Sequence, residues 1–212
     1  MGGRGKQFQL LGGRPLMCWA ARPLLAALDG SLAVVVPAGR LEEAEDLFLA
    51  HLPSAASRVR LTTGGTRRQD SVRAGLDALP EAVTVLVHDA ARPFASRGMC
   101  EKVARRAVAG RVVIPALPIH DTLKEIDGER VTATRDRGRY VTAQTPQGFP
   151  MAVLRRAHED AEPPAATDDA ELCERLGIPV MWIPGEDLNR KLTGTADWTW
   201  AERTIAGGGV RW

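Results

Sequence analysis

The sequence predicts an α/β protein with a mostly parallel, helix-covered sheet, and three observations carry this prediction. Apolar, β-branched runs alternate with segments of helical periodicity along the chain. Several of the apolar runs end abruptly in glycine or charge, which is typical of buried parallel strands whose carboxyl ends open onto a site. The chain has 212 residues, of which 44% are hydrophobic, enough for one sizeable core. We therefore expect residues 1–212 to form one domain.

The first two strand–helix units follow each other directly. LAVVVPAG (32–39) is an expected strand that ends in a turn, and residues 41–52 have apolar side chains at helical spacing. RVRLTTGG (58–65) is the second expected strand, and a helix expected over 66–79 ends before Pro80. Units of this length favour parallel strands joined by right-handed crossovers.

The later elements follow the same rule. VTVLVHD (83–89) is an expected strand, a helix is expected over 97–110, and RVVIPALP (111–118) is a fourth strand. Nearer the C-terminus we expect helices over 150–161, 167–177 and 195–206 and a strand over 180–185. The final GGGVRW is expected to be a mobile tail.

Residues 118–142 interrupt this alternation. Strand-like patterns flank Asp127-Gly128, a pair that favours a tight hairpin turn. The segment has too few apolar residues to form a core of its own. We therefore expect a protruding β-arm whose apolar face is covered by another subunit.

Composition narrows the class of protein. Lysine and arginine number 28 against 26 acidic residues, a net charge of +2, which gives no reason to expect nucleic acid as a partner. The three cysteines, Cys18, Cys100 and Cys173, are widely spaced and are expected to be buried, reduced thiols. There is neither an apolar stretch of membrane-spanning length nor a signal-peptide core, so we expect a soluble, cytoplasmic protein.

Two glycines end the second expected strand, and a helix begins directly after them. Gly65 lets the backbone approach a ligand, while Arg68 and Ser71 fall in the first helical turn, where free backbone N–H groups attract phosphate. The stretch suits a nucleotide base, ribose or phosphate. A plain strand-to-helix turn with solvated arginines fits the spacing about equally well.

The strand VLV ends in Asp89 and Arg92, where a magnesium ligand or a substrate-orienting carboxylate would stand. Such a pair can also be an ordinary ion pair. Lys6 near the start and Lys191 after the last strand supply further cations. Lysines and arginines converging on a carboxylate favour phosphoryl or nucleotidyl transfer, which rests on positioning and charge neutralisation. TPQGF (145–149) is a buried-loop candidate without evident chemistry.

Seven segments together resemble one enzyme family, 2-C-methyl-D-erythritol 4-phosphate cytidylyltransferase. They are KQFQLLGGRPL, GGTRRQDSV, VLVHDAARPF, PIHDTLKEI, TAQTPQGF, TDDAELCERLG and NRKLT, in the family's order and over nearly the whole chain. The resemblance implies a Rossmann-like nucleotidyltransferase fold and a homodimer interlocked through the β-arm. It also implies synthesis of 4-diphosphocytidyl-2-C-methyl-D-erythritol and pyrophosphate from CTP and the methylerythritol phosphate, in the non-mevalonate isoprenoid pathway.

The resemblance assigns catalytic roles to three residues. Lys6 would lie against the triphosphate and stabilise charge on the α-phosphate, with Lys191 near the same reacting centre. Asp89 would orient the methylerythritol hydroxyls or help to hold Mg²⁺, the implied cofactor. The methylerythritol phosphate would then attack the α-phosphorus in line, without a covalent enzyme intermediate.

Two further sets are implied to bind the substrates. For the nucleotide, Gly65 and Ser71 would contact cytosine, Arg68 would do so or only brace the loop, and the backbone of Ala90 would touch the ribose. The methylerythritol phosphate set comprises Arg92, Thr122, Arg137 and Thr193, of which Thr122 and Arg137 would reach from the arm into the partner's site.

The chain departs from the family pattern at its start. Members begin with a strand and a Gly-rich loop before the KQF segment, whereas this sequence opens at Met1-Gly2-Gly3, so a core strand is expected to be missing. A misplaced start, an incomplete chain and a degenerate copy are the competing explanations. Gly5 replaces a usual proline, and Leu188 leaves a second carboxylate ligand for Mg²⁺ in doubt. The alternative functions are a ribitol 5-phosphate cytidylyltransferase and a non-catalytic nucleotide-binding relative.

Overall fold

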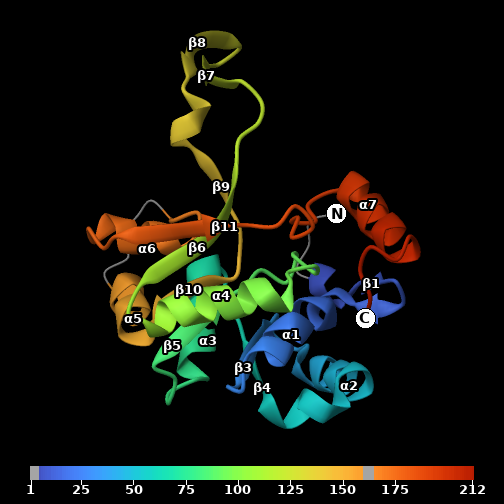
Figure 1. The fold of residues 1–212 in the computed structure, drawn as a ribbon. Helices are drawn as coiled ribbons and strands as arrows, with labels where there is room; N and C mark the ends of the chain where they lie inside the picture. The colour runs from blue at the N-terminus through green and yellow to red at the C-terminus, as the bar shows by residue number, and fades with distance from the viewer. Residues whose placement is uncertain (1–4, 160–164) are drawn as a thin grey trace.

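The computed structural model describes residues 5–159 and 165–212, and the expectation for Met1 to Gly3 lies outside them. Its principal sheet has five strands (Figure 1). In spatial order they are β11 (Val180–Pro184), β6 (Val112–Pro118), β10 (Gln147–Pro150) and β5 (Thr84–Val87), with β9 (Val141–Ala143) pairing β6 beyond the end of β10. The predicted α/β class is confirmed.

The sheet is mixed, because one strand runs against those that are parallel. β11 pairs with β6 in parallel, whereas β10 pairs antiparallel with both β5 and β6. β5, β6 and β11 therefore run in one direction and β10 runs against them. β10 (QGFP) takes up most of the TPQGF segment, which was predicted to be a buried loop. Gly148 of β10 is opposite Leu86 and Val113, and a Cβ there would stand 2.7 Å from Val103 Cγ1.

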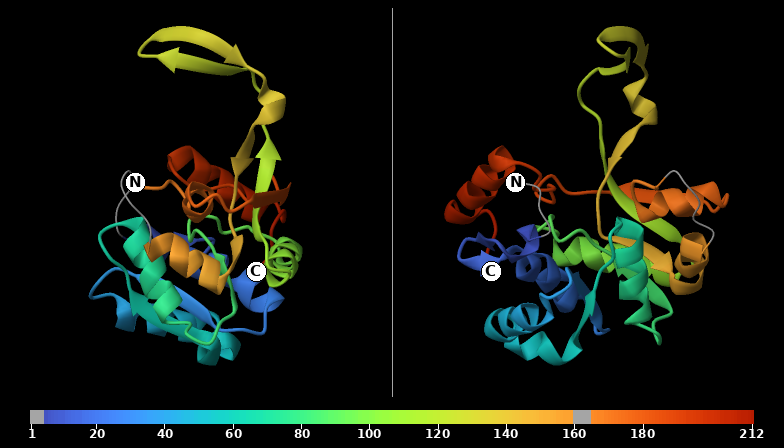
Figure 2. Two further views of the ribbon diagram at one scale, coloured as in Figure 1. Left: turned by 90° about the vertical axis from the view of Figure 1, so that its left-hand side faces the viewer. Right: turned by 180° about the vertical axis from the view of Figure 1, so that it is seen from behind.

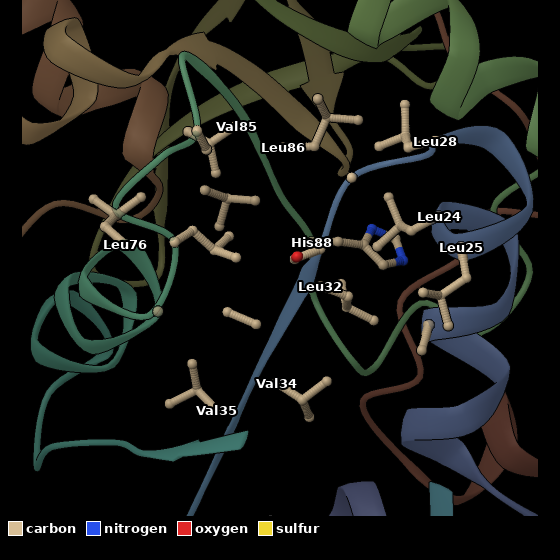
Figure 3. A pocket seen from close by; sticks show the side chains of 18 of the residues that line it. Leu24, Leu25, Leu28, Leu32, Val34, Val35, Leu76, Val85, Leu86 and His88 are labelled. Atoms are coloured by element: carbon tan, nitrogen blue, oxygen red, sulfur yellow. The ribbon is translucent and has the colours of Figure 1, made fainter. Parts of the chain in front are cut away.

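A second, parallel pair consists of β3 (Leu32–Val36) and β4 (Val59–Thr63). Among the described residues β3 has no strand partner on its other edge, and β5 has none on the edge away from β10. A cavity of about 670 Å³ lies between the two strands, lined mainly by aliphatic side chains (Figure 3).

Helices cover both faces of the principal sheet. Helix α4 (Arg97–Val108) packs on one face together with α1 (Leu16–Ala27), where Val113 of β6 joins their core cluster. The opposite face is covered by α3 (Arg68–Asp77), α5 (Met151–Glu159) and α6 (Asp169–Arg175). The neighbouring Val112 belongs to the cluster on that face, since successive strand residues point to opposite sides.

The remaining elements lie at the periphery. They are α2 (Leu41–His51), α7 (Thr195–Ala206), β1 (Leu10–Leu11), β2 (Arg14–Pro15) and the 3₁₀ turns η1 (Lys6–Phe8), η2 (Pro53–Arg58) and η3 (Arg137–Arg139). None of the helices in the described ranges is long and apolar enough to cross a bilayer.

The excursion at 118–142 forms the expected β-arm. Its hairpin joins β7 (Leu123–Asp127) to β8 (Arg130–Arg135), and it stands away from the body of the molecule (Figures 1 and 2). The two-residue turn is Gly128-Glu129, one residue later than expected, with Gly128 at φ 56°.

The C-terminal end corrects the prediction of a mobile tail. The ring of Trp212 stands edge-on to Trp19, with centroids 4.9 Å apart, and the guanidinium of Arg14 lies 4.3 Å from its centroid. These aromatic and cation–π contacts fix the last residue of the chain against α1.

Candidate active site

The turn after β5 is held by a chain of hydrogen bonds through Thr145. The backbone N–H of Asp89 donates to Thr145 Oγ1 at 3.0 Å, and Thr145 Oγ1 lies 2.9 Å from His88 Nδ1. His88 Nε2 lies 3.0 Å from the carbonyl oxygen of Arg92. Because a carbonyl only accepts, Nε2 carries the proton and Nδ1 accepts from the threonine hydroxyl. The turn that presents Asp89 is thus fixed from both sides.

Asp89 forms the centre of a cluster of positive charge. Its Oδ2 lies 2.9 Å from Lys191 Nζ and 3.8 Å from Arg92 Nε. Burial raises the pKa of Asp89, but the hydrogen bond from Lys191 and the charges of Lys191, Arg68 and Arg92 outweigh it, so the pKa is lowered. The carboxylate is therefore ionised near neutral pH.

The segment before α7 is tied to this turn by its backbone. The N–H of Leu192 donates to the carbonyl of Ala91 at 2.8 Å, and Lys6 Nζ donates to the carbonyl of Leu192. Asn189, fully buried, donates through Nδ2 to the carbonyl of Thr145 at 2.7 Å. Residues near both ends of the chain therefore meet beside the carboxyl end of β5, as the sequence predicted.

Arg92 is engaged largely in bracing this arrangement. Its Nη1 donates to the carbonyl of Asn189 at 2.8 Å and its Nη2 to that of Ala143 at 3.2 Å. The side chain is only 12% exposed, and burial lowers the pKa of Arg92. These contacts with backbone carbonyls were not foreseen from the sequence, where Arg92 was a candidate phosphate ligand.

The two glycines after β4 are required by the start of α3. A Cβ on Gly65 would lie 2.3 Å from Asp70 Cβ, and one on Gly64 would lie 2.6 Å from Ser71 Oγ. Asp70 caps the helix by accepting from the backbone N–H of Arg67 at 3.2 Å. A side chain at either glycine would displace the first turn of α3, which adds a structural reason to the ligand-approach reason proposed from the sequence.

The structure brings the two sequence-predicted segments to one cavity. Arg68 and Ser71 at the start of α3 line the 670 Å³ cavity together with Asp89 and Ala90. Figure 3 shows His88 among its lining side chains, beside the aliphatic residues of α1 and β3. Arg68 Nη2 also donates to Asp169 Oδ2 at 2.5 Å. The lining of the cavity therefore combines aliphatic side chains with a few polar ones, a combination typical of ligand sites.

Three predicted substrate ligands are not brought to Asp89 within the single chain. Thr122 is exposed at the start of the arm, and Arg137 further along it donates to the carbonyl of His120. Thr193 donates to Asp197 Oδ2 through both its N–H, at 2.8 Å, and its hydroxyl, at 2.7 Å. Asp197, in the first turn of α7, accepts both bonds, so the hydroxyl proton of Thr193 already has an acceptor.

The donor set fits a metal held mainly by substrate. Among residues 5–159 and 165–212 there is no group of three or more His, Cys, Asp or Glu side chains that could hold an ion. Asp89 is the ionised carboxylate at the site, whereas Glu186 accepts from Ser96, at 2.5 Å from its hydroxyl. Mg²⁺ is commonly bound by one or two carboxylates together with substrate phosphates, so Asp89 suits such a role.

The geometry favours transfer at a phosphate. Lys191, Arg68 and Arg92 act on the carboxylate of Asp89, and Lys6 binds the carbonyl of the neighbouring Leu192. Even with Arg68 paired to Asp169, positive charge exceeds negative charge there. A polyphosphate would neutralise this excess, and fixed cations stabilise charge that develops during phosphoryl or nucleotidyl transfer.

Comparison with known proteins decides the family. A sequence model of the 2-C-methyl-D-erythritol 4-phosphate cytidylyltransferase (IspD) family matches residues 1–206. The chain belongs to this family. The cytidylyltransferase of Prochlorococcus marinus is 39% identical over 207 residues, covering 96% of this chain and 91% of that protein. A bifunctional IspD/IspF enzyme of Solidesulfovibrio magneticus is 47% identical over 205 residues, which cover 92% of this chain and 50% of that enzyme. The chain thus spans about half the length of the bifunctional relatives that it matches.

Solved structures of IspD proteins share the fold. The Thermus thermophilus cytidylyltransferase superposes with a TM-score of 0.79 at 36% identity, covering 96% of this chain and 95% of that one. The 4-diphosphocytidyl-2C-methyl-D-erythritol synthase of Anaerococcus prevotii gives a TM-score of 0.86 at 27% identity, covering 96% and 92%. The predicted Rossmann-like nucleotidyltransferase fold is confirmed.

Sequence reasoning missed the residues that support this IspD site. Thr145 holds the Asp89 turn, Asn189 joins it to the Lys191 segment, and Asp169 binds Arg68. The sequence did hold a signal for Thr145, because polar residues of the segment TPQGF stand directly before its apolar residue Phe149. Buried polar groups need partners, so their presence in a core segment indicates a hydrogen-bond network.

Proposed function

We propose that this chain transfers a cytidylyl group from CTP to 2-C-methyl-D-erythritol 4-phosphate, giving 4-diphosphocytidyl-2-C-methyl-D-erythritol and pyrophosphate. The observation that carries the proposal is the Asp89–Lys191 pair at the end of β5, with Lys6 docked on the neighbouring Leu192. Family membership supports the choice of both substrates. The chain's described residues supply the charges that this reaction requires.

In the proposed reaction a phosphate oxygen of methylerythritol phosphate forms a bond to the α-phosphorus of CTP while the bond to pyrophosphate breaks. Lys6 and Lys191 stabilise the negative charge that builds up on the α-phosphate and the leaving group. Asp89 keeps Lys191 in place and orients the acceptor hydroxyls. The start of α3, with Gly65, Arg68 and Ser71, holds the cytosine, and the backbone at Ala90 contacts the ribose.

We propose Mg²⁺ as the divalent cation of the reaction. Asp89 would hold it together with phosphate oxygens of the substrate, and the ion would supply charge neutralisation. The lowered pKa of Asp89 keeps this ligand deprotonated at neutral pH.

The β-arm supports a homodimer. Along the arm Ile126, Val131, Tyr140 and Val141 are exposed within one chain, at fractions from 38% to 67%. A second copy that covers them would bury this apolar area, and a two-fold axis would place each arm against the other body. Thr122 and Arg137 would then bind the methylerythritol phosphate in the partner's site. Three unpaired thiols, all buried, support a cytoplasmic location.

The experiment that tests this proposal identifies the product. The chain is incubated with Mg²⁺, CTP and either methylerythritol phosphate or ribitol 5-phosphate, and products are resolved by mass spectrometry, with ATP replacing CTP as a control. A product formed only from CTP and methylerythritol phosphate supports the proposal. Preference for ribitol 5-phosphate would reassign the acceptor, and binding of CTP without any product would indicate a nucleotide-binding relative.

A further inference from the structure

A buried chain of three side chains runs behind the nucleotide-facing end of α3. Asp169 is fully buried, and its two oxygens have different partners. Its Oδ2 accepts from Arg68 Nη2 at 2.5 Å, and its Oδ1 lies 2.9 Å from His158 Nε2. Because a carboxylate only accepts, His158 donates through Nε2. Residues from α3, α5 and α6 are thereby linked through one carboxylate.

Asp169 is ionised and is free to bind Arg68, because the neighbouring Asp168 caps the helix. Burial raises the pKa of Asp169, but the hydrogen bond from His158 and the charge of Arg68 outweigh it and lower the pKa. The adjacent Asp168 has other partners: it accepts from Gln147 Nε2 at 2.7 Å and caps α6 through the N–H of Glu171 at 2.9 Å. The two neighbouring aspartates therefore have separate roles, one in the helix cap and one toward the site.

Arg68 stands at the other end of this chain. Its side chain is 34% exposed and lines the cavity that Asp89 also borders. Among the described residues its second terminal nitrogen, Nη1, is buried and has no hydrogen-bond partner. A guanidinium is planar and rigid, so an acceptor that fixes Nη2 also fixes the direction of the Nη1 donors. Because Nη1 has no accessible surface, Arg68 borders the cavity with the rest of its side chain.

We propose that Asp169 and His158 are positioning residues that hold the guanidinium of Arg68 at the cavity, where it binds the nucleotide. This inference rests on the proposed function for the identity of the nucleotide. The lysines at Asp89 serve the reacting phosphate, whereas the Asp169–Arg68 pair serves binding, although the charge of Arg68 also reaches Asp89. The expected signature is a weaker affinity for CTP with little change in kcat.

The test is a double-mutant cycle with CTP affinity as the readout. Asp169→Asn keeps the shape of the side chain but removes its charge, and Arg68→Gln removes the proposed donor. Each single variant is expected to raise the Kd for CTP, measured by titration calorimetry, about tenfold. The double variant should be no weaker than the weaker single variant, because Asp169 acts only through Arg68. His158→Gln should raise the Kd by about threefold.

Asp77→Asn is the matched control. It breaks another aspartate–arginine pair of α3, the one with Arg155 at 2.8 Å, at the opposite end of the helix, and should leave the Kd unchanged. Multiplicative effects of Asp169→Asn and Arg68→Gln would overturn the inference, as would a lowered melting temperature with unchanged CTP affinity. The calorimetric readout needs no turnover. Wild-type chain that binds no CTP overturns the proposed function as well, whereas unchanged binding in Asp169→Asn overturns only the positioning role.

Discussion

Asp89 and Lys191 form a direct ion pair, with Oδ2 and Nζ 2.9 Å apart, between the turn after β5 and the segment that leads into α7. The pair is partly exposed, so its Coulomb energy contributes little to folding by itself. Its importance is positional, because it fixes a flexible lysine beside the proposed phosphate site. A cation already in place stabilises developing charge without reorganisation during the reaction.

Replacing Asp89 by Asn should lower kcat by about a hundredfold or more while the chain stays folded, because fixed electrostatic groups commonly contribute that much. The carboxylate that orients Lys191 and the acceptor would be lost. Steady-state pyrophosphate release measures the effect, with circular dichroism as the folding check. The exposed Asp187→Asn is the control and should keep wild-type activity. A fully active Asp89→Asn variant would remove this residue from the mechanism.

The pH dependence of stability should reflect His88. Desolvation lowers the pKa of His88 to about 4 from an ordinary value of 6.5. Between these values the unfolded chain binds more protons than the folded one, so stability rises with pH and is lost as the pH falls from about 6.5 to about 4. Urea unfolding should give a free energy about 2 kcal/mol lower at pH 5 than at pH 7 from this group. In His88→Gln this part of the pH dependence should vanish, and an unchanged slope would contradict the assignment.

Thr145→Val should destabilise the site without changing the size of the side chain. It leaves the N–H of Asp89 and Nδ1 of His88 without the hydroxyl that now bonds to both. We expect a loss of about 1–3 kcal/mol in the free energy of unfolding, since unpaired buried polar groups cost that amount. Activity should fall as well. Thr142→Val, at an exposed hydroxyl at the base of the arm, is the control and should be near neutral.

Gly148→Ala tests the packing of the inserted strand β10. The new methyl group would stand 2.7 Å from Val103 Cγ1 and 3.0 Å from Ala107 Cβ, both on the rigid α4. Overpacking of this kind costs about 1–3 kcal/mol. Gly30→Ala adds the same group where nothing lies within 4 Å and should be tolerated. Equal denaturation midpoints for the two variants would contradict the described packing.

The exposed apolar residues of the arm lead us to predict a dimer that a single substitution in the arm disrupts. Ile126→Asp places a charge on a hairpin residue that is 67% exposed in one chain. If a second copy covers this residue, the variant should be monomeric in analytical ultracentrifugation at a concentration where the wild type is dimeric. Val108→Asp, at another exposed apolar residue on α4, should leave the dimer intact. A monomeric wild type would rule out the proposed dimer.

The strand–helix alternation was predictable because it depends on local periodicity. The segment LAVVV, the helix after GGTRR and the hairpin near Gly128 were all recognisable from their own residues. Helix α1 was missed because eight of its twelve residues are buried and Pro23 lies inside it, so it lacks the polar face and the uninterrupted pattern that mark a helix. Strand β10 was missed because its four residues include Gly148 and Pro150, which are depleted in strands.

The charged residues of the candidate site were predictable from the sequence, whereas the residues that hold them in place were not. Asp89 and Lys191 follow expected strands, which place them at one edge of the sheet. The pairing of Asp169 with Arg68 depends on a tertiary contact between distant segments, and no local pattern encodes it. Arg92 shows the same limit, since its backbone acceptors come from residues 143 and 189.

The central claim is that the Asp89–Lys191 cluster promotes cytidylyl transfer. Pyrophosphate release by the 212-residue chain, with Mg²⁺, CTP and methylerythritol phosphate, tests it most directly. The account predicts release in equal amount to 4-diphosphocytidyl-2-C-methyl-D-erythritol and none when either substrate is omitted. A folded, CTP-binding chain that releases no pyrophosphate would contradict it.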